Sequence, residues 1–258
     1  MSKNKSKSEN EKKADLKLKN AEIISKAFFY HSKGDISNAT IYYQYLIDLG
    51  IKDPRIFSNF GTIYKKKGQV SFAINLYKKA INFFPNSPEA YSNLGNIMKD
   101  LDKLDEAELY TRKAIKLKNN FVEAFSNLGN ILREKGNLKE AEKYIIKAIE
   151  LKPSYAEAHA NLGAILIEMG DYEKAKKSLK RAIKLKSNFI EAYSNLGKVY
   201  RCTGKIDKGI NCSVKIKRIR PWSINNSYSF NHLIKFINKD GRKKYDKKKV
   251  ITFPVLIE

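Results

Sequence analysis

The chain has very few cysteines, the residues whose disulfides stabilise small secreted domains. Its 258 residues include two cysteines, six prolines and one tryptophan. Two cysteines cannot build a disulfide framework, which excludes the disulfide-rich secreted class. No apolar stretch approaches the roughly 18 residues that a membrane-spanning helix needs, and the first twenty residues have no apolar core that would mark a secretory signal. We therefore expect a reduced, cytoplasmic protein with no membrane span.

Acidic residues are scarce relative to basic ones. The chain has 51 Lys and Arg against 27 Asp and Glu, a formal net charge of +24. The excess is mostly lysine, which suits an anionic partner but equally a solvated helical surface. Arginine, the better ligand for phosphate, is scarce beside lysine, and no nucleic-acid motif with interleaved aromatics is present. We expect only nonspecific nucleic-acid binding, at low salt.

Residues that carry common catalytic chemistry are few and scattered. The histidines His31, His159 and His232 are far apart and lack metal-ligand spacing to Cys202 or Cys212. No glycine-rich loop of the phosphate-binding type and no Ser-His-Asp constellation stands out. We therefore predict a protein that is not an enzyme, uses no cofactor and holds no metal. Both cysteines are predicted to be free structural thiols.

A period of 34 residues dominates the chain. The dipeptide Leu-Gly recurs at this spacing, with Phe-Gly one step earlier: Phe60-Gly61, Leu94-Gly95, Leu128-Gly129, Leu162-Gly163 and Leu196-Gly197. A second small residue follows each of these glycines at a constant distance: Ala73, Ala107, Ala141, Ala175 and Gly209. Small side chains allow two antiparallel helices to cross closely. The period therefore predicts a stack of helix–turn–helix units.

This pattern resembles the tetratricopeptide repeat. The resemblance implies an all-α fold, a right-handed α-solenoid of antiparallel helix pairs. Five units would occupy residues 54–87, 88–121, 122–155, 156–189 and 190–223, after a degenerate first unit at 20–53. Residues 224–238 are expected to form a capping helix over the last unit. The basic N-terminal segment 1–19 is expected to be disordered, and the basic tail 239–258 to be poorly ordered.

The helices are predicted at residues 20–33, 36–48, 54–67, 70–83, 88–101, 104–117, 122–135, 138–151, 156–169, 172–185, 190–203 and 206–218. A glycine follows the first helix of most units, where a left-handed residue ends a helix: Gly34, Gly68, Gly136, Gly170 and Gly204. Asp102 takes this place in one unit, and aspartate tolerates the left-handed conformation comparatively well.

The resemblance also implies that the first helix of each unit lines a concave groove. Its sixth position is asparagine in all five units: Asn59, Asn93, Asn127, Asn161 and Asn195. Other positions expected to face the groove are the ninth (Asn96, Asn130), the second (Glu89, Glu123, Glu157) and the twelfth (Lys65, Lys99, Arg133). These residues together are the predicted peptide-binding site.

The asparagine row is similar to the ladder in the repeat array of O-linked N-acetylglucosamine transferases, where it holds an extended peptide by its main chain. An amide offers both a donor and an acceptor, which is what a peptide unit requires. Two other interpretations stay open: the row is inherited by repeat duplication, or the asparagines bond to a neighbouring backbone. Asparagine is less favourable than alanine in a helix interior by several tenths of a kcal/mol, about 2–3 kcal/mol for five copies.

The sequence thus predicts a protein–protein interaction scaffold that binds an extended segment of a partner. The alternative is a substrate-recognition arm for a glycosyltransferase-type enzyme, inactive on its own. A clamp for C-terminal carboxylates is disfavoured, because glutamate occupies most second positions and would repel the carboxylate. Neither the partner nor the oligomeric state follows from the sequence.

Overall fold

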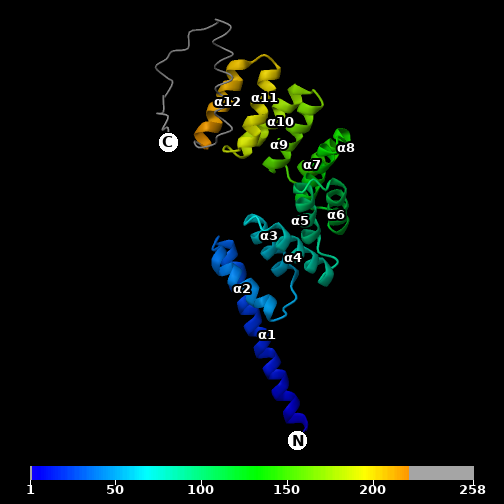
Figure 1. The fold of residues 1–258 in the computed structure, drawn as a ribbon, viewed down its shortest axis with the longest axis vertical. Coiled ribbons are helices and arrows are strands. Elements are labelled where there is room, and N and C mark those ends of the chain that lie inside the picture. Colours follow the sequence, from blue (N-terminus) through cyan, green and yellow to red (C-terminus); the bar gives the residue numbers. More distant parts are fainter. Residues whose placement is uncertain (1, 221–258) are drawn as a thin grey trace.

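The computed structural model describes residues 2–220, with side chains from residue 14 onward. The predicted capping helix and the predicted tail lie outside the described residues. Within them the chain forms only helices (Figure 1): α1 (Ser2–Ser32), α2 (Ile36–Asp48), α3 (Pro54–Lys66), α4 (Val70–Phe83), α5 (Pro88–Asp100), α6 (Leu104–Leu117), α7 (Val122–Glu134), α8 (Leu138–Leu151), α9 (Ala156–Glu168), α10 (Tyr172–Leu185), α11 (Ile190–Cys202) and α12 (Ile206–Ile219). None of these helices is both long enough and apolar enough to span a bilayer.

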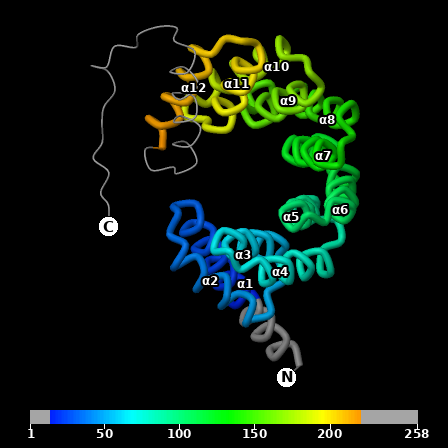
Figure 2. Tube along the Cα trace, turned by 45° about the horizontal axis from the view of Figure 1, so that its top comes forward, coloured from blue at the N-terminus to red at the C-terminus, as the bar shows by residue number. Residues whose placement is uncertain are grey.

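The helices pack as consecutive antiparallel pairs, and the pairs follow one another around an arc (Figure 2). The first helices of the pairs, α3, α5, α7 and α9, lie along the inner side of this arc, and α4, α6, α8 and α10 lie along the outer side. Each helix from α2 to α12 begins at the predicted residue and ends within one residue of the predicted end. The predicted all-α solenoid is therefore confirmed.

The N-terminal helix is longer than the sequence pattern predicts. We expected disorder before residue 20, whereas α1 begins at Ser2 and extends away from the array (Figure 1). No glycine or proline precedes Gly34, and the segment is rich in lysine, which is a good helix former. The segment has no apolar stripe, and the sequence pattern therefore predicts disorder there. Residues without helix breakers continue α1 to Ser2 without such a stripe.

The turns inside the helix pairs have the predicted geometry. The five glycines named above have positive φ angles, from 72° to 82°. Asp102, with φ 59°, is the one non-glycine residue with positive φ in the described part. Its backbone N–H donates to the carbonyl of Lys99 at 2.9 Å, and Lys103 donates to the carbonyl of Met98 at 2.8 Å. These bonds close the end of α5 and turn the chain into α6.

In the four pairs from α3–α4 to α9–α10 the helices approach so closely that glycine is needed at the crossing. A Cβ on Gly129 would lie 2.5 Å from the Ile145 side chain and 3.2 Å from the carbonyl oxygen of Ala141. Ile145 and Ala141 are both fully buried. The sequence located the crossing, but the side chain that fills it comes from one helical turn beyond the recurrent alanine position. The last pair is looser, because a Cβ on Gly197 would lie 3.4 Å from Cys212.

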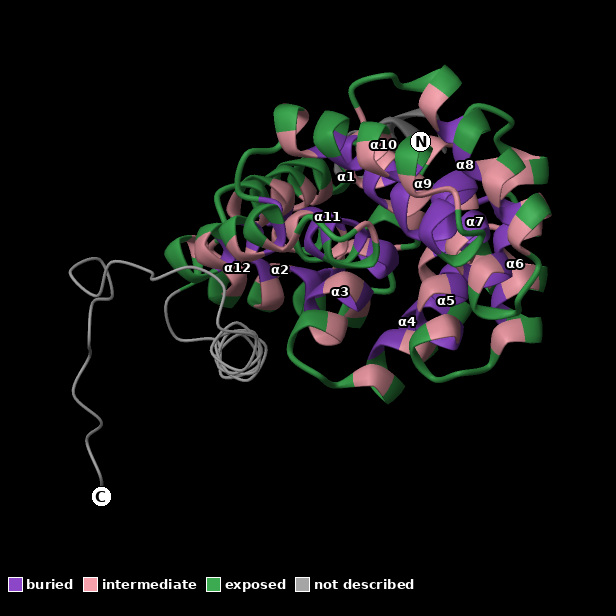
Figure 3. Cartoon of the chain, turned by 90° about the horizontal axis from the view of Figure 1, so that it is seen from above, coloured by how far each residue is buried: buried purple, intermediate pink, exposed green. Residues whose placement is uncertain are grey.

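The core is continuous from one pair to the next. Phe125 and Leu128 of α7, Ile145 of α8 and Ile165 of α9 belong to one buried cluster. Comparable clusters join the other neighbouring pairs. Figure 3 shows buried residues running from helix to helix and exposed residues gathered at the turns. A pair therefore buries its apolar face only against its neighbours.

The crossing predicts opposite effects for one substitution at two glycines. Gly129→Ala gains about 1 kcal/mol of helix propensity but overpacks a buried crossing. We expect its free energy of unfolding to fall by about 1–2 kcal/mol. Gly197→Ala has room for the methyl group and should be more stable than the parent by about 0.5–1 kcal/mol. Urea unfolding followed by circular dichroism measures both; a stabilised Gly129→Ala would contradict the close crossing.

Candidate functional site

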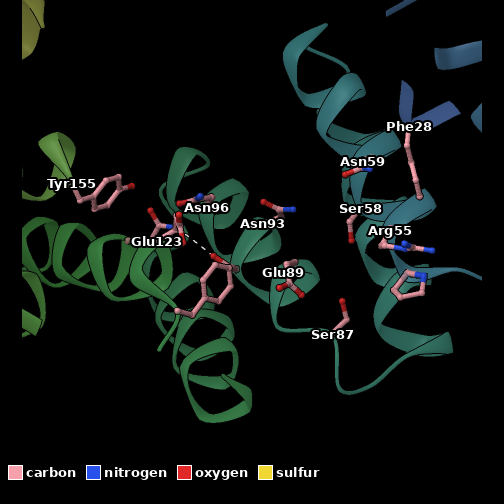
Figure 4. A pocket seen from close by; sticks show the side chains of 14 residues that line it. Phe28, Arg55, Ser58, Asn59, Ser87, Glu89, Asn93, Asn96, Glu123 and Tyr155 are labelled. Carbon is pink, nitrogen blue, oxygen red and sulfur yellow. Dashed lines mark hydrogen bonds between the residues drawn. The ribbon is translucent and has the colours of Figure 1, made fainter. Parts of the chain in front are cut away.

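A groove of about 600 Å³ lies on the inner side of the arc, between the first pairs. Figure 4 shows side chains from α1 and α3 on one wall facing side chains from α5, α7 and the start of α9 on the other. Its lining consists of Phe28, Pro54, Arg55, Ser58, Asn59, Ser87, Glu89, Ser92, Asn93, Asn96, Phe121, Glu123, Asn127 and Tyr155. Six of the predicted residues are among them: Asn59, Asn93, Asn96, Asn127, Glu89 and Glu123.

The helix geometry explains why the asparagines face the groove. Each precedes an apolar residue of the core, such as Leu94 or Leu128, which are completely buried. The buried neighbour fixes the rotation of the helix, and the amide then lies at the rim, partly exposed. Asn161 and Asn195 occupy the same position on α9 and α11, but they lie outside the lining of this groove.

Hydrogen bonds divide the asparagine row into two groups. Asn161 Nδ2 donates to the hydroxyl of Ser126 at 3.0 Å, and Asn127 Nδ2 donates to Ser92 at 3.4 Å. Each bond joins the sixth position of one repeat to the fifth position of the preceding repeat. Asn59 Nδ2 likewise donates to the hydroxyl of Tyr43, at 3.2 Å. These three amides therefore bond within the array, but to side-chain hydroxyls and not to a neighbouring backbone. Recurrent serine at the fifth position was the signal in the sequence.

The same bond is missing one repeat earlier. Ser58 occupies the fifth position there and is 7% exposed, yet its Oγ has no hydrogen-bond partner in the described structure. Asn93, the asparagine in register with it, makes no side-chain hydrogen bond to any described residue. Both side chains line the groove. Asn195 is also without such a bond, because the fifth position before it is Ala160.

The predicted basic residues of the twelfth position form ion pairs between repeats and do not line the groove. Lys65 Nζ lies 2.8 Å from the Asp100 carboxylate, Lys99 lies 3.7 Å from Glu134, and Arg133 lies 3.4 Å from Glu168. Each pair joins one first helix to the next. Asn130 and Glu157 also lie outside the lining.

Charges in the groove are neutralised locally, with one exception. Arg55 Nη2 lies 2.6 Å from the carboxylate of Asp53, and Glu89 lies 3.2 Å from Lys118 Nζ. The equivalent Glu157, two repeats after Glu89, lies 2.9 Å from Lys186. Glu123 has the same position in the repeat between these two, and no ion pair with a described residue holds it.

Aromatic rings at the repeat junctions complete the lining, and the sequence argument did not select them. Phe121 and Tyr155 occupy the last position of successive repeats, and Phe28 faces them from α1 (Figure 4). Burial, followed by the carboxylates of Glu157 and Glu123, raises the pKa of Tyr155 to about 12. The phenol therefore stays neutral at physiological pH. The recurrence of an aromatic at this position was visible in the sequence.

Comparison with known families supports the repeat assignment. Family models described as "TPR repeat" and "Tetratricopeptide repeat" match residues 61–102, 88–121 and 121–188. Residues 61–188, which these models match, consist of tetratricopeptide repeats. Such repeats stack into superhelices with extended concave surfaces, which generally mediate protein–protein interaction. A search among curated proteins found no match.

Solved structures share the TPR fold at low sequence identity. TTC0263, a thermophilic TPR protein of Thermus thermophilus, is 21% identical with a TM-score of 0.63, over 70% of this chain and 99% of that chain. A chain of the APC/C hetero-tetramer Cut9–Hcn1 is 20% identical with a TM-score of 0.77, over 83% and 43%. YrrB, a TPR protein with an unusual peptide-binding site, is 21% identical with a TM-score of 0.52, over 72% and 96%. At these identities the likeness establishes the fold alone.

The two serines of the fifth position give a matched pair of stability predictions. Ser58→Ala removes a buried hydroxyl that has no partner, whereas Ser126→Ala removes the acceptor of the bond from Asn161. Both variants gain the same helix propensity, so their difference reports the hydrogen bond. We expect Ser58→Ala to be more stable than Ser126→Ala by at least about 1 kcal/mol in urea unfolding. Equal stabilities would mean that Ser58 has a partner.

Proposed function

We propose that the protein is an interaction scaffold whose groove binds an extended segment of a partner protein. The observation that carries this proposal is a groove of about 600 Å³ with asparagine amides from three successive first helices in its lining. Amides at regular steps suit a regularly repeating ligand, and an extended polypeptide repeats its N–H and C=O groups every few ångströms.

The surroundings of the amides support a peptide over a small molecule. Its lining combines asparagine amides and serine hydroxyls with the rings of Phe121 and Tyr155. Side chains of a bound segment would pack against the rings while its main chain bonds to Asn93 and Asn96. YrrB is described as having a peptide-binding site, and it shares the TPR fold.

The resemblance of the asparagine row to that of O-linked N-acetylglucosamine transferases supports main-chain recognition. The resemblance does not imply that this chain catalyses a transfer reaction. Association with a transferase would be one way to use the groove, and the binding experiment below applies to either case. The lysine-rich outer helices are an alternative surface for anionic partners, and the salt dependence of binding distinguishes them from the groove.

Substitution of unpaired amides should separate binding from folding. Asn93 and Asn96 line the groove and make no side-chain hydrogen bond in the described structure. We expect the double variant Asn93→Ala/Asn96→Ala to fold like the parent and to bind a fluorescein-labelled, degenerate nonapeptide library about 5- to 150-fold more weakly. This corresponds to about 1–3 kcal/mol for two lost amides. Fluorescence polarisation at about 150 mM salt measures the affinity.

Asn161→Ala is the matched control. Its amide is bonded to Ser126 and lies outside the groove lining. We expect this variant to lose stability and to keep its affinity for the library. If the parent binds no library peptide, or if the double variant binds as well as the parent, the groove does not have the proposed function.

A further inference from the structure

Among the described residues, one charged group of the groove has no counter-ion. Four of its lining residues carry titratable side chains: Arg55, Glu89, Glu123 and Tyr155. Arg55 is paired with Asp53, Glu89 is paired with Lys118, and burial keeps the Tyr155 phenol neutral. The carboxylate of Glu123 is thus the charge that the groove presents to a ligand.

The neighbouring repeats show what normally neutralises this carboxylate. In the repeats before and after, a lysine near the end of the unit lies over the junction aromatic and also pairs with the glutamate. Lys118 Nζ lies 4.8 Å from the centre of the Phe121 ring and 3.2 Å from Glu89. Lys186 lies 4.6 Å from Phe189 and 2.9 Å from Glu157.

The equivalent lysine between them does not complete the arrangement. Lys152 Nζ lies 5.6 Å from the centre of the Tyr155 ring, farther than its counterparts, and forms no ion pair with Glu123. Glu89 and Glu157 are therefore each paired with a lysine, and Glu123, in the repeat between them, is not. The carboxylate of Glu123 lines the groove. Phe121 and Tyr155 on either side provide rings for the aliphatic stem of a long cationic side chain.

A second polar group without a partner lies in the same groove. The hydroxyl of Ser58 is more than nine-tenths buried and unpartnered. In the next two repeats the equivalent hydroxyl accepts a hydrogen bond from an asparagine amide. Buried hydroxyls without a partner are rare, and each calls for an explanation. Ser58, Asn93 and Glu123 line the same groove, so the two unpaired polar groups and the unpaired carboxylate face one space (Figure 4).

Building on the proposed function, we infer that the groove selects extended peptide segments that carry a lysine or arginine side chain. The main chain of the segment bonds to Ser58 and Asn93, and the cationic side chain pairs with Glu123 between Phe121 and Tyr155. Glu123 is thus the residue that determines specificity. The selection opposes the overall charge of the protein, +24, which repels cationic peptides at long range. At physiological salt this repulsion is screened beyond about 8 Å, and the local pair dominates.

Three nonapeptide libraries of equal complexity test the inference, with lysine, norleucine or glutamate fixed at the central position. Norleucine keeps the aliphatic stem of lysine without its charge. Fluorescence polarisation with the full chain at physiological salt should give about tenfold tighter binding for the lysine library than for the norleucine library, and the weakest binding for the glutamate library. Binding of all three libraries with equal affinity would refute the selection while leaving peptide binding intact. Absence of any binding would refute the proposed function itself.

Single-residue variants test whether Glu123 causes the preference for the lysine library. Glu123→Gln should bind the lysine and norleucine libraries equally, and Glu123→Lys should prefer the glutamate library. Glu157→Gln, whose carboxylate is paired with Lys186 outside the groove lining, should keep the parental preference. Ser58→Ala should bind the lysine library several-fold more weakly without losing thermal stability, and Ser126→Ala should bind it as the parent does. A preference that survives in Glu123→Gln would assign the selection elsewhere.

A measurement on the unaltered protein covers the case in which a variant does not fold. A water-soluble carbodiimide joins a carboxylate to a lysine amine that touches it. With the lysine-centred library, peptide mapping by mass spectrometry should recover the cross-link at Glu123. Recovery at Glu157 or Glu191 in its place would overturn the assignment.

Discussion

The close crossing of the two helices in each repeat is the constraint on which the rest of the structure depends. At Gly95, Gly129 and Gly163 an added Cβ would lie 2.4–2.5 Å from a side chain of the paired helix. That spacing sets the tilt between the helices and therefore the rotation from one pair to the next. The curvature of the arc, and with it the existence of an inner groove, follows from this repeated contact. The looser fit at Gly197 marks the pair at the end of the described array.

Contacts between neighbouring repeats then hold the arc together. Shared core clusters, the ion pairs of the twelfth position and the bonds from asparagine to serine each join a repeat to its neighbour. On the outer side Arg112 adds to these links, since it donates to Glu140 and to the hydroxyl of Tyr144, both 2.8 Å away. Because every link is local, the array behaves as a nearly one-dimensional structure, and a change in one repeat affects mainly its neighbours.

The groove depends on departures from this regularity. A repeat array that satisfied every polar group internally would offer a ligand little to bond. In the structure an asparagine–serine bond joins α7 to α5 and α9 to α7, whereas the equivalent bond is missing between α5 and α3, and Glu123 has no ion pair with a described residue. The unsatisfied groups lie together in the groove because neighbouring repeats place equivalent positions side by side.

The sequence by itself determined the period, the twelve helices up to residue 219 apart from the true start of α1, and the left-handed turns, Asp102 included. These features are local: glycine, small-residue spacing and helix propensity act within one repeat. It also determined that Asn59, Asn93 and Asn127 would share one face. Only the tertiary structure decided which of these side chains already have a hydrogen-bond or ion-pair partner within the array. Ser58 and Ser126 have the same residue type and position, as do Glu89 and Glu123. They differ because pairing requires a partner from another helix within hydrogen-bond distance, and that distance is set by how the repeats stack.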